Sequence, residues 1–223
     1  MAVALDHLVV AAHTLDAGVA WCEATLGIVP GPGGRHPLMG THNRLLSIAT
    51  PAFPRAYLEI IAVDAQAPGR PRWFDLDDAA LRAAIAREPA LVHWVARCDD
   101  IDAEVAALAR LGIDRGRVIE AARDTPAGLL SWRISVRDDG ARLSRGALPT
   151  LIEWGEAHPA DTMSASGATL ESLRVRSPDV APLRQALNAI GAGGVRIEAG
   201  APALDALLHT PRGAVRLRSP IEA

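Results

Sequence analysis

The chain has 223 residues, of which 49% are hydrophobic, so it can bury a sizeable core and is globular rather than disordered. Its formal net charge is −3, with acidic and basic residues interspersed, which argues against nucleic acid or an anionic membrane as a partner. No apolar run approaches the ~20 residues that span a bilayer, and we expect no signal peptide. Cys22 and Cys98 are far apart, which is typical of reduced thiols and predicts a cytoplasmic protein.

The first 64 residues predict a strand, a helix and three further strands. Thr14 or Asp16 caps the helix, and Gly27 ends it. A Gly- and Pro-rich stretch precedes the last two strands and leaves room for one short strand at most. In chain order, the expected elements are a strand at 3–10, a helix ending at 27, the Gly- and Pro-rich stretch at 31–40, and strands at 43–49 and 56–63.

The same order of elements returns twice, so we predict an α+β fold made of repeated βαβββ units. Residues 65–90 form a linker with a short helix around 77–87. A third, weaker copy begins near Ala168 and is interpreted as structural or as a surface for a homodimer. The predicted units are therefore 1–64, 91–160 after the linker, and a degenerate third unit at 168–223.

Superposing the first two units aligns two histidines and two glutamates. L-D-H-L-V-V lies over L-V-H-W-V-A, so His93 falls on His7, and Y-L-E-I-I lies over L-I-E-W, so Glu153 falls on Glu59. Burying a carboxylate among apolar strand residues is costly unless it is paired or bound to metal. Two His and two Glu at equivalent positions fit a divalent cation, and two separate Glu–His ion pairs are the alternative.

The third unit lacks this pattern. Glu171 stands where the other units have histidine, and Arg216 stands near the place of the glutamates. We expect these two residues to form a salt bridge within a unit that binds no metal.

These residues resemble the vicinal oxygen chelate superfamily, which includes glyoxalase I, methylmalonyl-CoA epimerase, extradiol dioxygenases and the bleomycin resistance proteins. The runs G-G-R-H-P-L-M-G-T-H-N-R-L-L (33–46) and Y-L-E-I-I-A-V-D (57–64) are similar to its glyoxalase-like subgroup. The resemblance covers roughly residues 3–160. It implies that paired units form a curled mixed β-sheet around a cleft, with helices outside.

The resemblance also implies a function. His7, Glu59, His93 and Glu153 would bind a divalent metal (Ni, Zn, Mn or Fe), and Glu59 or Glu153 would be the catalytic base of an isomerase or lyase. The substrate would be a small oxygenated metabolite that chelates the metal through neighbouring oxygens. The alternatives are an extradiol-type dioxygenase with two His and one Glu on Fe(II), and a non-catalytic binding or resistance protein.

Other polar and aromatic residues are candidates for binding the substrate. Trp73 and its neighbour Phe74 lie in the linker, where they either cover the cleft or pack in the core. Trp94 and Trp154 have the opposite strand parity to His93 and Glu153, and we expect them between the sheet and the helices. The predicted substrate-binding residues are His36, His42, Asn43, Arg44 and Trp73.

Overall fold

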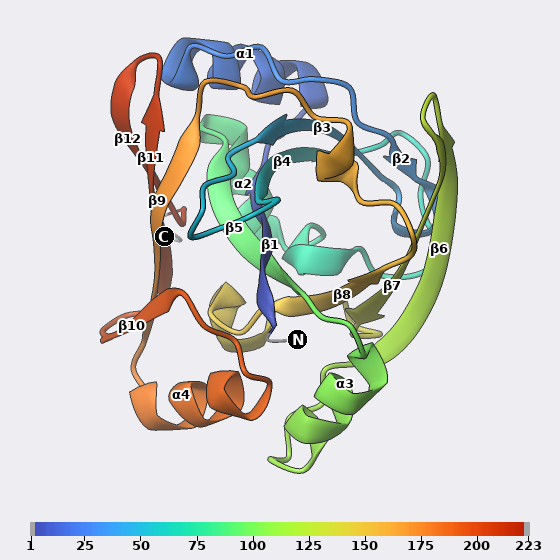
Figure 1. Ribbon diagram of the computed structural model, residues 1–223, viewed down its shortest axis with the longest axis vertical. Helices are drawn as coiled ribbons and strands as arrows, with labels where there is room; N and C mark the ends of the chain where they lie inside the picture. The colour runs from blue at the N-terminus through green and yellow to red at the C-terminus, as the bar shows by residue number, and fades with distance from the viewer. Residues whose placement is uncertain (1–2, 221–223) are drawn as a thin grey trace.

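The computed structural model describes residues 3–220, which form two β-sheets and four α-helices. The larger sheet has eight strands in the order β2-β3-β4-β1-β5-β8-β7-β6. It curls so strongly that its two edge strands, β2 and β6, come to lie on the same side of the molecule (Figure 1). No helix in the described part of the chain is both long and apolar enough to cross a membrane.

The first unit has the predicted order of elements. The Thr14 hydroxyl accepts a hydrogen bond from the Ala17 amide at 3.2 Å, and Gly27 ends the helix in the left-handed region with φ 74°. The Gly- and Pro-rich stretch contains a two-residue strand and one turn of 3-10 helix, η1 (Pro37–Met39). The other elements are β1 (Ala4–Ala11), α1 (Leu15–Leu26), β2 (Arg35–His36), β3 (Thr41–Ser47) and β4 (Tyr57–Val63).

The second unit repeats the first, and the two join along their first strands. β1 pairs in parallel with β4 and antiparallel with β5, and β5 pairs in parallel with β8. Between the units lie η2 (Trp73–Asp75) and α2 (Ala79–Arg87), a helix capped by Asp78. The second unit consists of β5 (Ala90–Arg97), α3 (Ile101–Ala109), β6 (Arg117–Thr125), β7 (Gly128–Val136) and β8 (Thr150–Trp154).

The third unit has the predicted elements in the predicted order, but its strands pair differently. Its first strand, β9, lies inside a four-stranded sheet ordered β10-β9-β11-β12, whereas β1 pairs with the last strand of its own unit. The unit is therefore no copy of the other two in topology. Its elements are β9 (Thr169–Ser177), α4 (Val180–Ala189), β10 (Val195–Ala199), β11 (Ala203–Thr210) and β12 (Gly213–Arg218).

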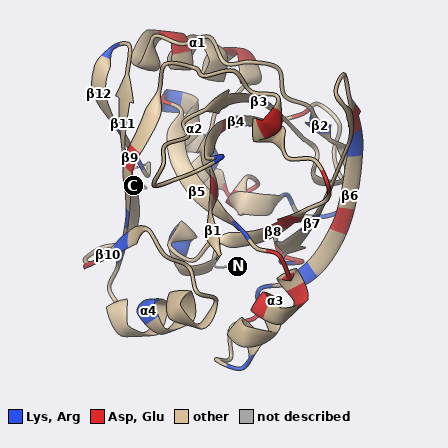
Figure 2. Ribbon diagram, viewed as in Figure 1, with Lys and Arg blue, Asp and Glu red and all other residues tan. Residues whose placement is uncertain are grey.

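The predicted salt bridge of the third unit is not formed. Glu171 instead lies 2.6 Å from His209 Nε2, and Arg216 pairs with Asp205 at 2.6 Å. Both pairs are partly exposed. Figure 2 shows charges of both signs mixed along the outer elements, β6 and α3 included.

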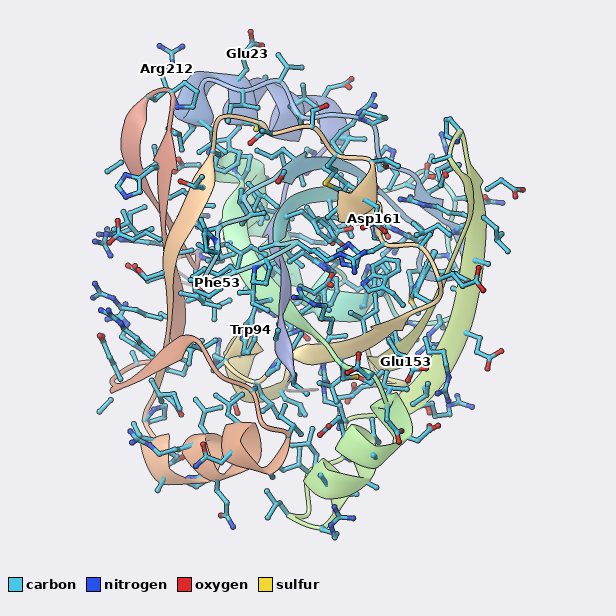
Figure 3. All side chains as sticks on the ribbon, in the orientation of Figure 1. Glu23, Phe53, Trp94, Glu153, Asp161 and Arg212 are labelled. Carbon is cyan, nitrogen blue, oxygen red and sulfur yellow. The ribbon has the colours of Figure 1, made fainter. Side chains whose placement is uncertain are left out.

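Two apolar clusters lie on the opposite faces of the larger sheet. The outer cluster contains Trp94 (Figure 3) from β5 together with Leu173 and Leu204 from the third unit, so the small sheet covers this outer face. The inner cluster contains Val9 and Val95 and fills most of the concave face. Successive residues along each strand therefore point to opposite faces of the sheet, and the inner, concave face is the one that can hold a site.

Candidate functional site

The concave face of the larger sheet encloses a narrow cavity of about 30 Å³, which is room for about two water molecules. Strands of both units and the 3-10 helix η2 line it. The polar lining residues are His7, His36, Asn43, Tyr57, Glu59 and Arg123, and the apolar ones include Trp73, Trp132, Ile134, Ile152 and Trp154.

Asp6 is a fully buried carboxylate on β1. At a point where the pairing with β5 is irregular, its Oδ1 lies 2.6 Å from Nδ1 of the neighbouring His7. Its Oδ2 lies 2.8 Å from His158 Nε2 and accepts a hydrogen bond from Trp154 Nε1 at 3.0 Å. Burial would raise the pKa of Asp6, but the hydrogen bonds from His158 and His7 outweigh it and hold the pKa well below its ordinary value. Asp6 is therefore an anion.

His158 begins the 3-10 helix η4 (Pro159–Asp161), and its contacts fix its tautomer. Nδ1 accepts a hydrogen bond from the Ala160 amide at 3.0 Å, so Nε2 carries the ring hydrogen and donates to Asp6. The Asp161 carboxylate in turn accepts from the His158 amide at 2.9 Å. These contacts tie the segment after β8 to β1. The sequence analysis assigned no role to Asp6 or His158.

His7 directs one ring nitrogen to Asp6 and the other to Glu59. Because an ionised carboxylate only accepts hydrogen bonds, Nδ1 carries a hydrogen and donates it to Asp6. Nε2 lies 3.6 Å from Glu59 Oε2, which is too long for a direct hydrogen bond but close enough for one bound atom to contact both groups. Tyr57 stacks on the imidazole with ring centroids 4.5 Å apart and holds its plane.

Glu59, on β4, is oriented by the Gly-rich run of the first unit. Asn43 Nδ2 donates a hydrogen bond to Glu59 Oε1 at 2.5 Å, and Asn43 Oδ1 accepts one from the Gly34 amide at 2.7 Å. The second bond determines which end of the amide faces the carboxylate. A Cβ on Gly33 would lie 2.2 Å from the Asn43 carbonyl oxygen, so this close approach requires glycine. The run therefore acts on the site through Glu59.

The predicted substrate-binding residues divide into two groups. His36, Asn43 and Trp73 line the cavity, whereas His42 and Arg44 do not. Side chains alternate along β3, so Asn43 faces inward and Arg44 faces solvent. Burial, followed by nearby positive groups, lowers the pKa of His36 to about 3, so this ring is neutral. Trp73 is buried in the inner cluster, and its Nε1 has no hydrogen-bond partner within residues 3–220.

In the second unit, Thr150 occupies the place that Glu59 has in the first. The strand register shows this, because Val9, two residues after the first histidine, pairs with Glu59. Val95, two residues after the second histidine, pairs with Thr150. The structural counterpart of Glu59 is thus a threonine that the sequence analysis did not consider.

Glu153 lies on the outer face of β8, three residues after Thr150. Its Oε2 accepts a hydrogen bond from the Ile101 amide at 2.7 Å and lies 3.5 Å from Arg133 Nη1. Figure 3 shows Glu153 beside the start of α3. Trp154 correspondingly faces the cavity, which corrects the expectation that it packs against the helices. Glu153 was aligned with Glu59 because both are glutamates in similar sequence runs. The strand register instead aligns Glu59 with Thr150.

His93 is fully buried and turns toward Thr150. Its Nε2 accepts a hydrogen bond from the Thr150 amide at 3.1 Å, and Arg115 donates to the Thr150 hydroxyl. Burial, followed by the charges of Arg115 and Arg142, lowers the pKa of His93 well below its ordinary value. The His93 ring is therefore neutral and structural in this conformation.

The neutral state of His93 predicts a pH dependence of stability. Below the unfolded-state pKa of about 6.5, His93 binds a proton in the unfolded chain but not in the folded protein. The free energy of unfolding therefore falls as the pH falls. One such histidine contributes up to about 1.4 kcal/mol per pH unit. In His93→Gln, whose side-chain oxygen can still accept from the Thr150 amide, this part of the slope should disappear. Urea unfolding at pH 7, 6 and 5 tests it, and equal slopes for both proteins would contradict the assignment.

The residues present do not fit the four-ligand metal site that the resemblance implies. Within residues 3–220, no three His, Cys, Asp or Glu side chains lie close enough to bind one ion together. His7 and Glu59 approach each other, but His93 is bound to Thr150 and Glu153 lies on the outer face. The two-His, one-Glu set of a dioxygenase likewise has no third ligand in the described chain.

A known domain family and solved structures resemble this chain over most of its length. The profile of the glyoxalase-like domain family matches residues 5–191. No curated protein matches the chain. A crystal structure of a hypothetical protein from Staphylococcus aureus is similar at 18% identity and TM-score 0.60, covering 89% of this chain and 86% of that one. A methylmalonyl-CoA epimerase from Streptomyces coelicolor, in complex with 2-nitronate-propionyl-CoA, is 21% identical over 69% of this chain and 96% of its own, at TM-score 0.43.

Proposed function

The chain belongs to the glyoxalase-like domain family, and from this we propose that it is an isomerase or lyase that moves a proton on a small oxygenated metabolite. Glu59 is the base that takes the proton, and His7 is its acid–base partner. The observation that supports this most strongly is the chain of contacts from Asp6 through His7 to Glu59, at the wall of a narrow cavity.

Glu59 has the properties that a base in this cavity needs. Its side chain is only 6% exposed, so few water molecules compete with a substrate for the carboxylate. Asn43 donates a hydrogen bond to Oε1, which leaves Oε2 for the substrate. General bases held in this way contribute about 10²- to 10⁴-fold to a proton-transfer rate.

His7 supplies the complementary acid. Its Nδ1–H is held by the Asp6 anion, which fixes the orientation of the ring with Nε2 toward Glu59. A proton at Nε2 faces the same space as Glu59 Oε2, so it can be donated to a substrate oxygen that becomes negative while Glu59 takes the neighbouring C–H proton. The Nε1–H of Trp73, which has no partner within residues 3–220, is a further donor on the wall.

This proposal contains no metal-dependent step. The ligand set that would hold a divalent ion does not converge in residues 3–220, so the acid and the base are both side chains of the first unit. Asp6 orients His7 in the way that a buried carboxylate orients a catalytic imidazole in other enzymes.

The test is exchange of a substrate C–H proton with D₂O. A panel of 2-oxo acids, 2-hydroxy ketones and hemithioacetals is incubated with the protein, and the C–H signal next to the carbonyl is followed by proton NMR. We expect catalysed exchange for at least one member, and expect it to survive exhaustive chelation. No exchange above the buffer rate for any member would contradict the proposal, and a strict need for added divalent metal would contradict its metal-free form.

A further inference from the structure

A second, larger hollow of about 800 Å³ adjoins the inner cavity. It lies between the residues that precede β2, strand β3, the tip of the β6–β7 hairpin and the segment that carries η4. The two spaces share four lining residues and therefore lie against one another: Leu45, Arg123, Leu130 and Pro159 belong to both. The hollow is therefore the mouth of the cavity, and we call it the mouth hollow.

Arg123 lies at the junction of the two spaces. Its Nε and Nη1 are buried, yet no hydrogen bond or ion pair to them exists within residues 3–220. A guanidinium with buried and unsatisfied N–H groups is costly unless an anion satisfies them, and its fork of donors matches a carboxylate. An anionic ligand beside the Arg123 guanidinium would therefore satisfy these N–H groups.

The chain makes room for this guanidinium. A Cβ on Gly34 would lie 1.6 Å from Arg123 Nη1, so the guanidinium packs directly on the backbone of the Gly-rich run. The same Gly34 amide orients Asn43. The run thus brings the cation and the proposed base to one place.

The walls of the mouth hollow are largely apolar. Val29 and Leu129 on its rim are 64% and 62% exposed, which is unusual for large hydrophobic residues, and Leu46 and Met163 lie in its wall. The acidic residue in the lining, Asp161, is already paired with Arg55 and bound to the His158 amide. Within residues 3–220, Arg123 is therefore the charged residue of this lining that no ion pair balances.

We propose that the mouth hollow and Arg123 form a binding site for an amphiphilic organic acid, whose carboxylate lies on Arg123 and whose alkyl or acyl chain lies along the apolar walls. The inner cavity, at about 30 Å³, admits only the reacting group, so the rest of a ligand must occupy the mouth hollow. As a statement about the substrate, the inference rests on the proposed function. As a statement about binding, it is independent of Glu59 chemistry.

Straight-chain carboxylates from butanoate to decanoate are the probes. Binding is measured by calorimetry and by the emission of Trp132 and Trp154, which line the inner cavity. We expect the affinity to rise about threefold to fourfold for each added methylene, the factor for burying one CH₂, until the hollow is filled. An affinity that does not depend on chain length would overturn the proposal.

Three variants identify the anchor. Arg123→Gln should weaken decanoate binding about 10- to 100-fold, the range for losing a hydrogen-bonded charge pair. Arg117→Gln makes the same charge change on the same strand, but its side chain is 75% exposed and pairs with Asp138, so it should bind like the unaltered protein. Gly34→Ala should weaken binding as Arg123→Gln does, because the new Cβ displaces the guanidinium without altering charge. Equal binding by all three would overturn the proposal.

The two proposals fail in different ways. Carboxylate binding that depends on Arg123, together with no proton exchange in the panel, would refute the proposed function and leave the binding site standing. Exchange that depends on Glu59 but is indifferent to chain length and to Arg123 would refute the binding site alone. Glu59→Gln should still bind decanoate, because it leaves Arg123 and the mouth hollow unchanged.

Discussion

Replacing Asp6 with asparagine should lower the free energy of unfolding by about 2–4 kcal/mol, because hydrogen bonds to a buried charge contribute about 1.5–3 kcal/mol each. The carboxylate is completely buried and receives three N–H groups, from His7, His158 and Trp154. An amide offers one oxygen, and its NH₂ can only donate. Since the Nε2–H of His158 is fixed as a donor by its contact with Ala160, the asparagine NH₂ can best turn toward His7.

The substitution should therefore also change the tautomer of His7. Nδ1 would become an acceptor, and the ring hydrogen would move to Nε2, on the side of Glu59. Urea unfolding measures the stability, and ¹⁵N chemical shifts of the two ring nitrogens report the tautomer. Trp154→Phe is the matched control, since it removes one of the three donors and leaves the carboxylate charged. A loss of stability in the control as large as in Asp6→Asn would show that ring packing, and not the charge, stabilises this corner.

The strands and helices of this fold are predictable because their signals are local. Thr14 and Gly27 bound α1 through contacts that lie within four residues of the chain. Asp78 caps α2 through its own third neighbour in the same way. Alternation of side chains then separates inner from outer residues on each strand. In the third unit the same signals give the elements and not their pairing, because pairing depends on which apolar faces meet after folding.

The candidate site was predictable only in its first half. Within the first unit, the sequence predicts that His7 and Glu59 belong to one site, and His7 Nε2 lies 3.6 Å from Glu59 Oε2. In the second unit, the sequence alignment placed Glu153 opposite Glu59, three residues away from Thr150, the true counterpart. A shift by an odd number of residues exchanges the two faces of a strand. The register of β5 with β8 is a tertiary property, so Thr150 could not be found from the letters alone.

Asp6 and His158 lay beyond sequence reasoning for a different reason. They are 152 positions apart, and the second unit has Val92 where the first has Asp6, so the repeat does not point to this pair. An acidic residue beside a histidine on an apolar strand is the one signal that the sequence offered. Arg123 escaped notice because an arginine on an edge strand is ordinarily solvated, and its burial depends on the missing side chain at Gly34.

The activities of Glu59→Gln and Glu153→Gln distinguish the two alignments of the units, one with Glu153 and the other with Thr150 as the counterpart of Glu59. If Glu59 is the base, its amide variant should lose at least about 100-fold of the proton-exchange rate, since an amide cannot accept a proton at neutral pH. The fold should persist, because glutamine can still accept the hydrogen bond from Asn43. Proton NMR in D₂O gives the rate, and the urea midpoint confirms that the variant is folded.

Glu153→Gln should behave in the opposite way. Its carboxylate lies at the amino end of α3 and near Arg133, so the amide should cost about 1 kcal/mol of stability and leave the exchange rate unchanged. A fall in exchange with Glu153→Gln as large as with Glu59→Gln would mean that both units contribute a carboxylate to the reaction. β8 would then have to shift by an odd number of residues in the active protein, which would move Trp154 out of the cavity and break its hydrogen bond to Asp6. Because that bond is one of the three that the Asp6 carboxylate accepts, such a shift would also reduce the effect of Asp6→Asn, and the two experiments therefore test one register.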